Sequence, residues 1–231
     1  MYPFFYDWTM IIVIPGLLLA MYAQMKVSTT YERYSKVASA SGLTGAKVAR
    51  AILDSAGTEH VGVEMIEGNL TDHYDPRAKV LRLSRQVYGG NSLASLGVAA
   101  HEAGHAIQHA VGYLPLNIRH SLVPVANFGS TLAFPLFLIG LFVSIPPLIT
   151  AGLYLFAAVV LFQLVTLPVE FNASSRALAV LEGSGYISRS EVPGTKAVLD
   201  AAALTYVAAA LVGLLNLLRL MVLAGVFRRD D

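Results

Sequence analysis

Four long apolar runs constrain the fold of this chain more than any other feature of its sequence. Residues 8–25, 122–143 and 148–167 contain no charged residue, and residues 205–226 contain only one, Arg219. A helix needs about 20 apolar residues to cross the roughly 30 Å hydrocarbon core of a bilayer. The sequence therefore predicts a mainly α membrane protein with about four apolar helices.

The overall composition also favours a membrane protein. Hydrophobic residues make up 55% of the chain and charged residues only 13%, whereas soluble domains carry about 25% charged residues. The formal net charge of +1 gives no electrostatic reason to expect a nucleic acid as partner. The chain contains no cysteine. This excludes disulfides and thiol catalysis, and it leaves histidines and carboxylates as metal ligands.

The apolar runs divide the chain into five predicted parts. We expect an anchor at 8–25, a polar catalytic domain at 26–121, a transmembrane hairpin at 122–167, a helical segment at 168–204 and a fourth apolar helix at 205–226. The first run is interpreted as an uncleaved anchor rather than a signal peptide, because no basic residue precedes it. The fourth run is predicted either to span the membrane or to pack against the other helices with Arg219 turned inward or snorkelling.

The basic residues predict the orientation of the chain. Residues 26–121 hold ten of the 16 Lys and Arg residues, and residues 171–204 hold three more. Basic segments favour the cytoplasmic side of a membrane. We therefore predict a multi-pass protein of the cell (inner) membrane whose active site faces the cytoplasm.

The polar domain is predicted to be a small α+β fold. Residues 44–56 show the periodicity of an amphipathic helix. Residues 61–66 and 80–84 are typical of strands. Ser92 or Ser95 is expected to cap a further helix, which continues through the motif described next.

The helix that follows these serines carries His101-Glu-Ala-Gly-His105. Residues four apart lie one turn apart on the same helical face, so both imidazoles can reach a single ion. Glu102 lies beside them, where it can hold and deprotonate a metal-bound water. Zinc suits such a site because it accepts neutral imidazole and lowers the pKa of bound water towards about 7. We therefore predict Zn²⁺ bound by His101 and His105, with Glu102 as the catalytic base.

Gly104 is an unfavourable residue inside this helix, costing about 1 kcal/mol relative to alanine. We interpret it as the mark of a close approach by another backbone or by substrate. The alternative for the whole motif is a chance match on an ordinary surface or core helix.

A catalytic zinc normally has three protein ligands and a water. Glu170, which directly follows the third apolar run, is the predicted third ligand, because two membrane crossings return the chain to the face that it left. Glu182 is the reserve candidate, and an interfacial carboxylate is the other interpretation of Glu170. His109 continues the histidine stripe, but a straight helix spreads three such residues over about 12 Å. It is therefore expected on the helix surface or in a substrate cleft, and exposed or interfacial positions are expected for the remaining histidines, His60, His73 and His120.

Segments around these residues resemble a known family. They are DHYDPR at 72–77, LRLS at 81–84, GVAAHEAGHAIQ at 97–108 and EFNASSRA at 170–177. Together they resemble the bacterial membrane zinc metallopeptidases called YugP-like, or putative neutral zinc metallopeptidases, along essentially the whole chain. The resemblance implies a zinc endopeptidase of the gluzincin type, in which a glutamate is the third ligand, with a zincin-like catalytic domain.

More distantly, the chain is similar to HtpX-like proteases and CaaX prenyl endopeptidases. In those relatives an aspartate orients a zinc-bound histidine, whereas Ser174 stands at the matching position here. The charged partner of that histidine is thus missing or supplied from elsewhere.

We therefore expect a zinc endopeptidase that hydrolyses membrane or membrane-surface proteins. Its expected partners are a protein or peptide substrate and the lipid bilayer, with other membrane proteins or a second copy left open. The strand at 80–84 is expected either to pair with an extended substrate or to be ordinary sheet. One alternative is an intramembrane site-2-type protease, although a glutamate and three histidines make residues 93–112 a poor span. The other is a non-enzymatic membrane scaffold with a structural metal.

Overall fold

The structure is a computed structural model that describes residues 8–226. Residues 1–7, on which the argument against a signal peptide depends, lie outside the described residues, as do residues 227–231. The described chain forms two compact units. Residues 8–23, 118–167 and 205–226 make up the first, called here the apolar unit, and residues 24–117 and 168–204 make up the second, called the polar unit.

The predicted mainly α fold is confirmed, with three helices long and apolar enough to cross a membrane. They are α5 (Leu114–Val143), α6 (Pro146–Gly183) and α7 (Val192–Leu223). The first apolar run is not a fourth such helix: it is divided between a 3-10 turn, η1 (Trp8–Ile12), and α1 (Ile14–Ser35). The second half of α1 is polar, which lowers the hydropathy of the helix as a whole. The anchor at 8–25 therefore stays a prediction.

Within the apolar unit, glycines let the helices approach backbone to backbone. A Cβ on Gly152 of α6 would lie 2.8 Å from the Phe137 nitrogen of α5, and one on Gly129 of α5 would lie 2.9 Å from the Leu155 oxygen. Small residues at such close contacts are the usual packing of helices in membranes. Only two residues connect α5 to α6, and the first of them, Ser144, has a positive φ of 58°.

The single charged residue of the fourth apolar run is turned inward. Arg219 of α7 donates from Nε to Thr9 Oγ1 at 3.2 Å, and Thr9 is buried. This contact agrees with an inward-turned Arg219, and α7 is also long and apolar enough to span, so whether the fourth run crosses the membrane stays a prediction. A hydrogen-bonded partner reduces the cost of an arginine among apolar helices.

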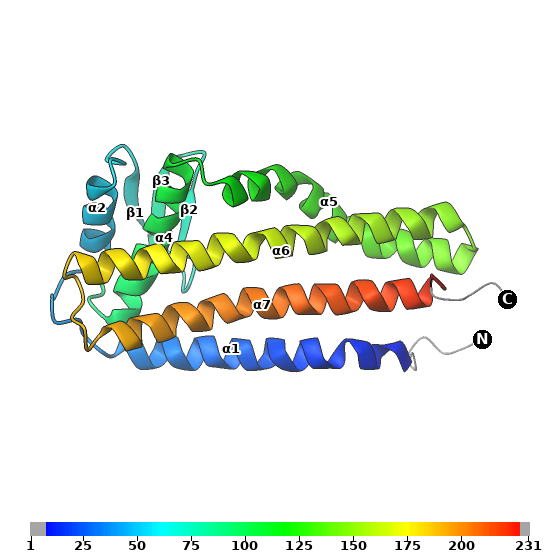
Figure 1. The fold of residues 1–231 in the computed structure, drawn as a ribbon, viewed down its shortest axis with the longest axis horizontal. Helices are drawn as coiled ribbons and strands as arrows, with labels where there is room; N and C mark the ends of the chain where they lie inside the picture. The colour runs from blue at the N-terminus through cyan, green and yellow to red at the C-terminus, as the bar shows by residue number, and fades with distance from the viewer. Residues whose placement is uncertain (1–7, 227–231) are drawn as a thin grey trace. The chain divides into compact units, whose positions relative to one another are not determined.

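The polar unit contains a three-stranded sheet in the order β1-β3-β2 (Figure 1). Strand β1 (Gly62–Ile66) pairs in parallel with β3 (Val80–Ser84), and β2 (His73–Asp75) pairs antiparallel to β3. The expectation that β3 pairs with a substrate is wrong, because β1 and β2 occupy both of its edges. Strand β2 was not predicted, since three residues beside a turn are too few to show alternation.

Helix α4 (Leu93–Ala110) begins at one of its two predicted caps, and α2 (Gly45–Ser55) begins at a cap that was not predicted. Thr44 caps α2 and Ser92 caps α4, where its hydroxyl accepts from the Ser95 N–H at 3.1 Å. Helix α4 packs against α2 and contacts β2, β3 and the short α3 (Arg85–Gly89). The core between these elements is built from fully buried aliphatic side chains, including Val48, Ile52, Leu53, Leu81, Leu83 and Leu96.

Candidate metal centre

The structure brings His101, His105 and Glu170 together within the polar unit. Glu170 Oε2 lies 3.2 Å from His101 Nε2 and 3.5 Å from His105 Nε2. The three candidate ligand atoms all lie within 4.8 Å of one another, and the Glu170 side chain is buried. Two imidazole nitrogens and a carboxylate oxygen form a donor set that suits zinc. These residues therefore form a possible metal-binding group.

Two helices position this group. The i, i+4 spacing on α4 places both imidazoles on one face, with ring centroids 4.8 Å apart. Glu170 does not begin a separate helical segment as expected, because α6 continues unbroken from Pro146 to Gly183 (Figure 1). An uninterrupted helix fixes the position of Glu170 more closely than a loop would.

Gly104 explains how closely α4 approaches α6. A Cβ at this position would lie 3.0 Å from the Ala173 oxygen and 3.3 Å from the Ala173 Cα. Backbone atoms cannot rotate away as the end of a side chain can. The close approach of another backbone, predicted from this unfavourable glycine, is thus present, one turn from Glu170 on α6.

Each histidine ring is held at the nitrogen that faces away from Glu170. His101 Nδ1 lies 3.1 Å from Ser174 Oγ, and His105 Nδ1 lies 3.0 Å from Gln108 Oε1. The Gln108 oxygen can only accept, so His105 carries its proton on Nδ1 and its Nε2 is the acceptor towards a cation. The Ser174 hydroxyl can donate or accept, so its contact fixes the orientation of the His101 ring. Ser174, at the position where distant relatives carry aspartate, thus orients His101 with a neutral hydroxyl.

Gln108 is a site residue that sequence reasoning missed. Its side chain is fully buried, and its Nε2 donates to the Val169 carbonyl at 2.8 Å and to Asn172 Oδ1 at 3.0 Å. Gln108 therefore connects His105 on α4 to the turn of α6 that carries Glu170. A polar amide in an otherwise apolar stretch, three residues after a candidate ligand, was the available signal.

Replacing Ser174 with alanine should weaken zinc binding by about 10- to 100-fold, the usual effect of losing a partner of a ligating histidine. The His101 ring would lose the group that fixes its orientation. Competition titration with a chelating dye measures the affinity. Ser175→Ala is the matched control, since the neighbouring Ser175 is exposed and bonds only the Phe171 carbonyl of its own helix. Equal affinities in both variants would contradict the role given to Ser174.

Glu102 lies beside the metal-binding group but outside it. Burial raises the pKa of its carboxyl above the ordinary value, although His105 and His101 partly offset this effect. Glu102 Oε2 accepts a hydrogen bond from the Tyr74 N–H of β2 at 3.1 Å. The pKa of His105 is also altered: burial lowers it, but the hydrogen bond to Glu170 and the charge of Glu102 raise it above the ordinary value overall.

The remaining candidates lie elsewhere. His109 Nδ1 lies 2.8 Å from Tyr74 Oη, so the predicted non-ligand position of His109 agrees with this contact. Within residues 8–226, neither His109 nor the reserve candidate Glu182 belongs to the metal-binding group. The side chains of Glu182, His60, His73 and His120 are exposed.

Comparison with known proteins agrees with this geometry. A family model described as "Putative neutral zinc metallopeptidase" matches residues 9–225. The chain belongs to this family. It is also 51% identical over 212 residues to the "Putative membrane protease YugP" of Bacillus subtilis (strain 168), covering 92% of this chain and 94% of that protein. No solved structure matches the chain. Zinc is thus the cofactor of the family, and the chain is a protease homologue with three candidate spans.

Proposed function

We propose that this chain is a zinc-dependent membrane endopeptidase of the gluzincin type, with His101, His105 and Glu170 as zinc ligands and Glu102 as the catalytic base. The convergence of both Nε2 atoms on one oxygen of the buried Glu170 carries this proposal. Family membership supports the zinc peptidase chemistry. The subtype follows from the third ligand, which is a glutamate rather than a third histidine.

The chain's own groups account for the proton transfers of peptide hydrolysis. Zinc, when bound, polarises the peptide carbonyl and lowers the pKa of water. Glu102 takes a proton from the attacking water as the new carbon–oxygen bond forms. It then gives that proton to the leaving nitrogen as the carbon–nitrogen bond breaks. Burial supports this role, because a carboxylate whose pKa is raised is the stronger base.

The free edge of β2 is the proposed docking edge for an extended substrate, in place of β3. The Tyr74 N–H donates to Glu102, so it points away from β3, towards the proposed base. Because the Tyr74 N–H is already bonded to Glu102, an extended peptide that adds to this edge would pair with the Tyr74 carbonyl, beside Glu102. The scissile bond then lies next to the group that activates water.

Hydrolysis should depend on zinc. We expect the purified full chain in detergent to lose its peptide hydrolysis on treatment with a chelator and to recover it with Zn²⁺ but not with Mg²⁺, which prefers an octahedral set of oxygens. A mixture of synthetic peptides analysed by mass spectrometry measures the cleavage. A scaffold with a structural metal would bind zinc and cut nothing, and that outcome would refute the proposed function.

We further propose that the substrates are membrane or membrane-surface proteins and that the active site faces the cytoplasm. Glu170 belongs to the same helix as a candidate span, which supports a site near the membrane. The basic composition of residues 26–121 supports the orientation. Helix α4 is not among the candidate spans of the described residues, which argues against the site-2-type alternative.

Cysteine labelling in oriented membrane vesicles tests this topology. The chain has no native cysteine, so Arg77→Cys and Ser175→Cys each give a single label at an exposed position. Both should react with an impermeant maleimide only from the cytoplasmic side, because the chain between them is predicted to cross the membrane twice. Labelling from opposite sides would refute the hairpin, and Glu170 could then not be the third ligand.

A further inference from the structure

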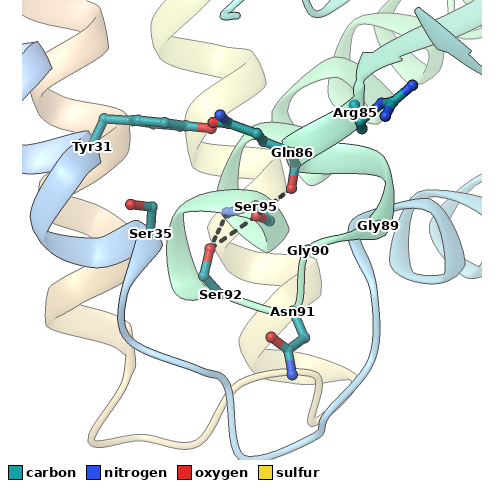
Figure 2. A pocket seen from close by; sticks show the side chains of 9 residues that line it. All are labelled: Tyr31, Ser35, Arg85, Gln86, Gly89, Gly90, Asn91, Ser92 and Ser95. Atoms are coloured by element: carbon teal, nitrogen blue, oxygen red, sulfur yellow. Dashed lines mark hydrogen bonds between the residues drawn. The ribbon is translucent and has the colours of Figure 1, made fainter.

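We propose that a polar cavity beside the start of α4 is a substrate subsite, which receives an uncharged polar side chain two or three residues beyond the scissile bond. This inference rests on the proposed function. The cavity has a volume of about 460 Å³. Figure 2 shows it between the end of α1 and the segment that runs from α3 into α4, with Tyr31, Gln86 and Ser95 among its lining residues.

The cavity lies on the same face of α4 as the proposed catalytic base. Ser95 precedes Glu102 by seven residues, which is nearly two whole turns and about 10 Å along the helix. The Ser95 hydroxyl donates to the Gln86 carbonyl at 3.2 Å and so fixes this wall of the cavity (Figure 2). An extended chain advances about 3.3 Å per residue. A substrate whose scissile bond lies beside Glu102 therefore reaches the cavity within about three residues.

The cavity also lies near the first residue of β2, His73. Asp72, which directly precedes β2, accepts hydrogen bonds from the Ser84 N–H at 2.7 Å and from the Ser84 hydroxyl. Ser84 in turn directly precedes Arg85 in the cavity wall. Burial raises the pKa of Tyr31, and the charge of Asp72 raises it further, which agrees with a position of Asp72 near this wall of the cavity.

This arrangement sets the direction of the substrate. Along α4, the order is the cavity at Ser95, then Glu102, then His109, which contacts Tyr74 of β2. A chain that pairs antiparallel to β2 runs towards the first residue of β2, and antiparallel pairing is the slightly more stable kind. The residues on the carboxyl side of the scissile bond therefore enter the cavity.

The lining determines which side chain is accepted. Hydroxyls of Tyr31 and Ser35 and amides of Gln86 and Asn91 line the cavity, and no lining residue is a carboxylate or an aliphatic side chain. The Ser35 hydroxyl already donates to the Glu32 carbonyl at 2.8 Å, but an apolar substrate side chain would offer no partner to the Tyr31 hydroxyl or to the two amides. Asp72, whose charge acts on Tyr31, and Glu67, which pairs with the lining residue Arg85 at 3.0 Å, disfavour a further negative charge. An amide or hydroxyl side chain fits best.

Gly89→Phe tests the subsite by filling it. Gly89 lines the cavity, its φ is not in the left-handed region, and a Cβ there would meet no atom within 4 Å. Gly183→Phe is the matched control. Gly183, like Gly89, is the last residue of its helix, and a Cβ added there would also meet no atom within 4 Å, but Gly183 does not line the cavity. Thermal unfolding and zinc content show whether both variants fold.

Cleavage of a synthetic peptide mixture gives the readout, as residue preferences on each side of the cut. The wild type should prefer Gln or Asn over Leu at the second or third residue on the carboxyl side by about tenfold, the value of one or two hydrogen bonds. Gly89→Phe should abolish this preference and Gly183→Phe should retain it. Tyr31→Phe, which removes one hydroxyl, should reduce it several-fold even if Gly89→Phe does not fold.

Three results would overturn the inference. Unchanged preferences in folded, active Gly89→Phe and Tyr31→Phe would refute the subsite and leave the peptidase proposal intact. A changed preference confined to the amino side of the cut would refute the direction of binding. A zinc-loaded wild type that cuts no peptide would refute the proposed function and, with it, the subsite.

Discussion

Glu102→Gln should retain zinc and lose peptide hydrolysis by about 10²- to 10⁴-fold, the usual contribution of a general acid–base group. Glutamine has nearly the shape of glutamate, and its oxygen can still accept the Tyr74 N–H that bonds Glu102 at 3.1 Å. The local structure should therefore persist, while the ability to take a proton from water is lost. Elemental analysis gives the zinc content, and turnover of a cleaved peptide gives the rate.

Glu182→Gln is the matched control for this variant. It makes the same chemical change at an exposed glutamate that is not in the metal-binding group. It should leave both the zinc content and the rate at wild-type values. If Glu102→Gln bound zinc and still turned over at the wild-type rate, Glu102 could not be the base.

Glu170→Ala should reduce zinc affinity by more than about 100-fold. The loss of a ligand should exceed the roughly 10- to 100-fold effect of losing a residue that only hydrogen-bonds a ligand. The wild type should bind one zinc per chain through the three-residue group. Without Glu170, the two histidines lose the only carboxylate of that group. Zinc content after dialysis and competition titration measure the loss, and hydrolysis should fall with it.

Glu182→Ala is the control here, since Glu182 was the reserve candidate for the third ligand and lies on the same helix, α6. It should bind zinc as the wild type does. The opposite pattern, with zinc kept by Glu170→Ala and lost by Glu182→Ala, would transfer the third ligand to Glu182. Retention by both variants would refute a carboxylate ligand on this helix.

The sequence predicts the metal-binding group because its geometry is mostly local. The spacing of His101 and His105 is a helical repeat, and the place of Glu170 follows from the number of apolar runs before it. Gly104 indicates a close approach by another backbone or by substrate because glycine is otherwise costly inside a helix. Its neighbour, Ala173, could not be identified in this way, since tertiary contacts leave no period in the sequence.

The features that sequence reasoning missed depend on long-range contacts. The role of Gln108 depends on Val169 and Asn172, more than 60 positions away. Strand β2 exists because β3 offers it an edge, and not because His73–Asp75 has a strand pattern. For the same reason the sequence left open whether β3 pairs with a substrate or is ordinary sheet: an alternating pattern predicts a strand but not its place in the sheet.

The division of the metal-binding group between α4 and α6 has a consequence for the biogenesis of the protein. His101 and Glu170 are 69 positions apart in the chain, and both long apolar segments of the predicted hairpin lie between them. A ribosome-bound chain therefore exposes the histidines and Glu102 well before Glu170 is synthesised. With the proposed ligands, such a nascent chain has an incomplete zinc site, so the peptidase stays inactive until its hairpin has been made.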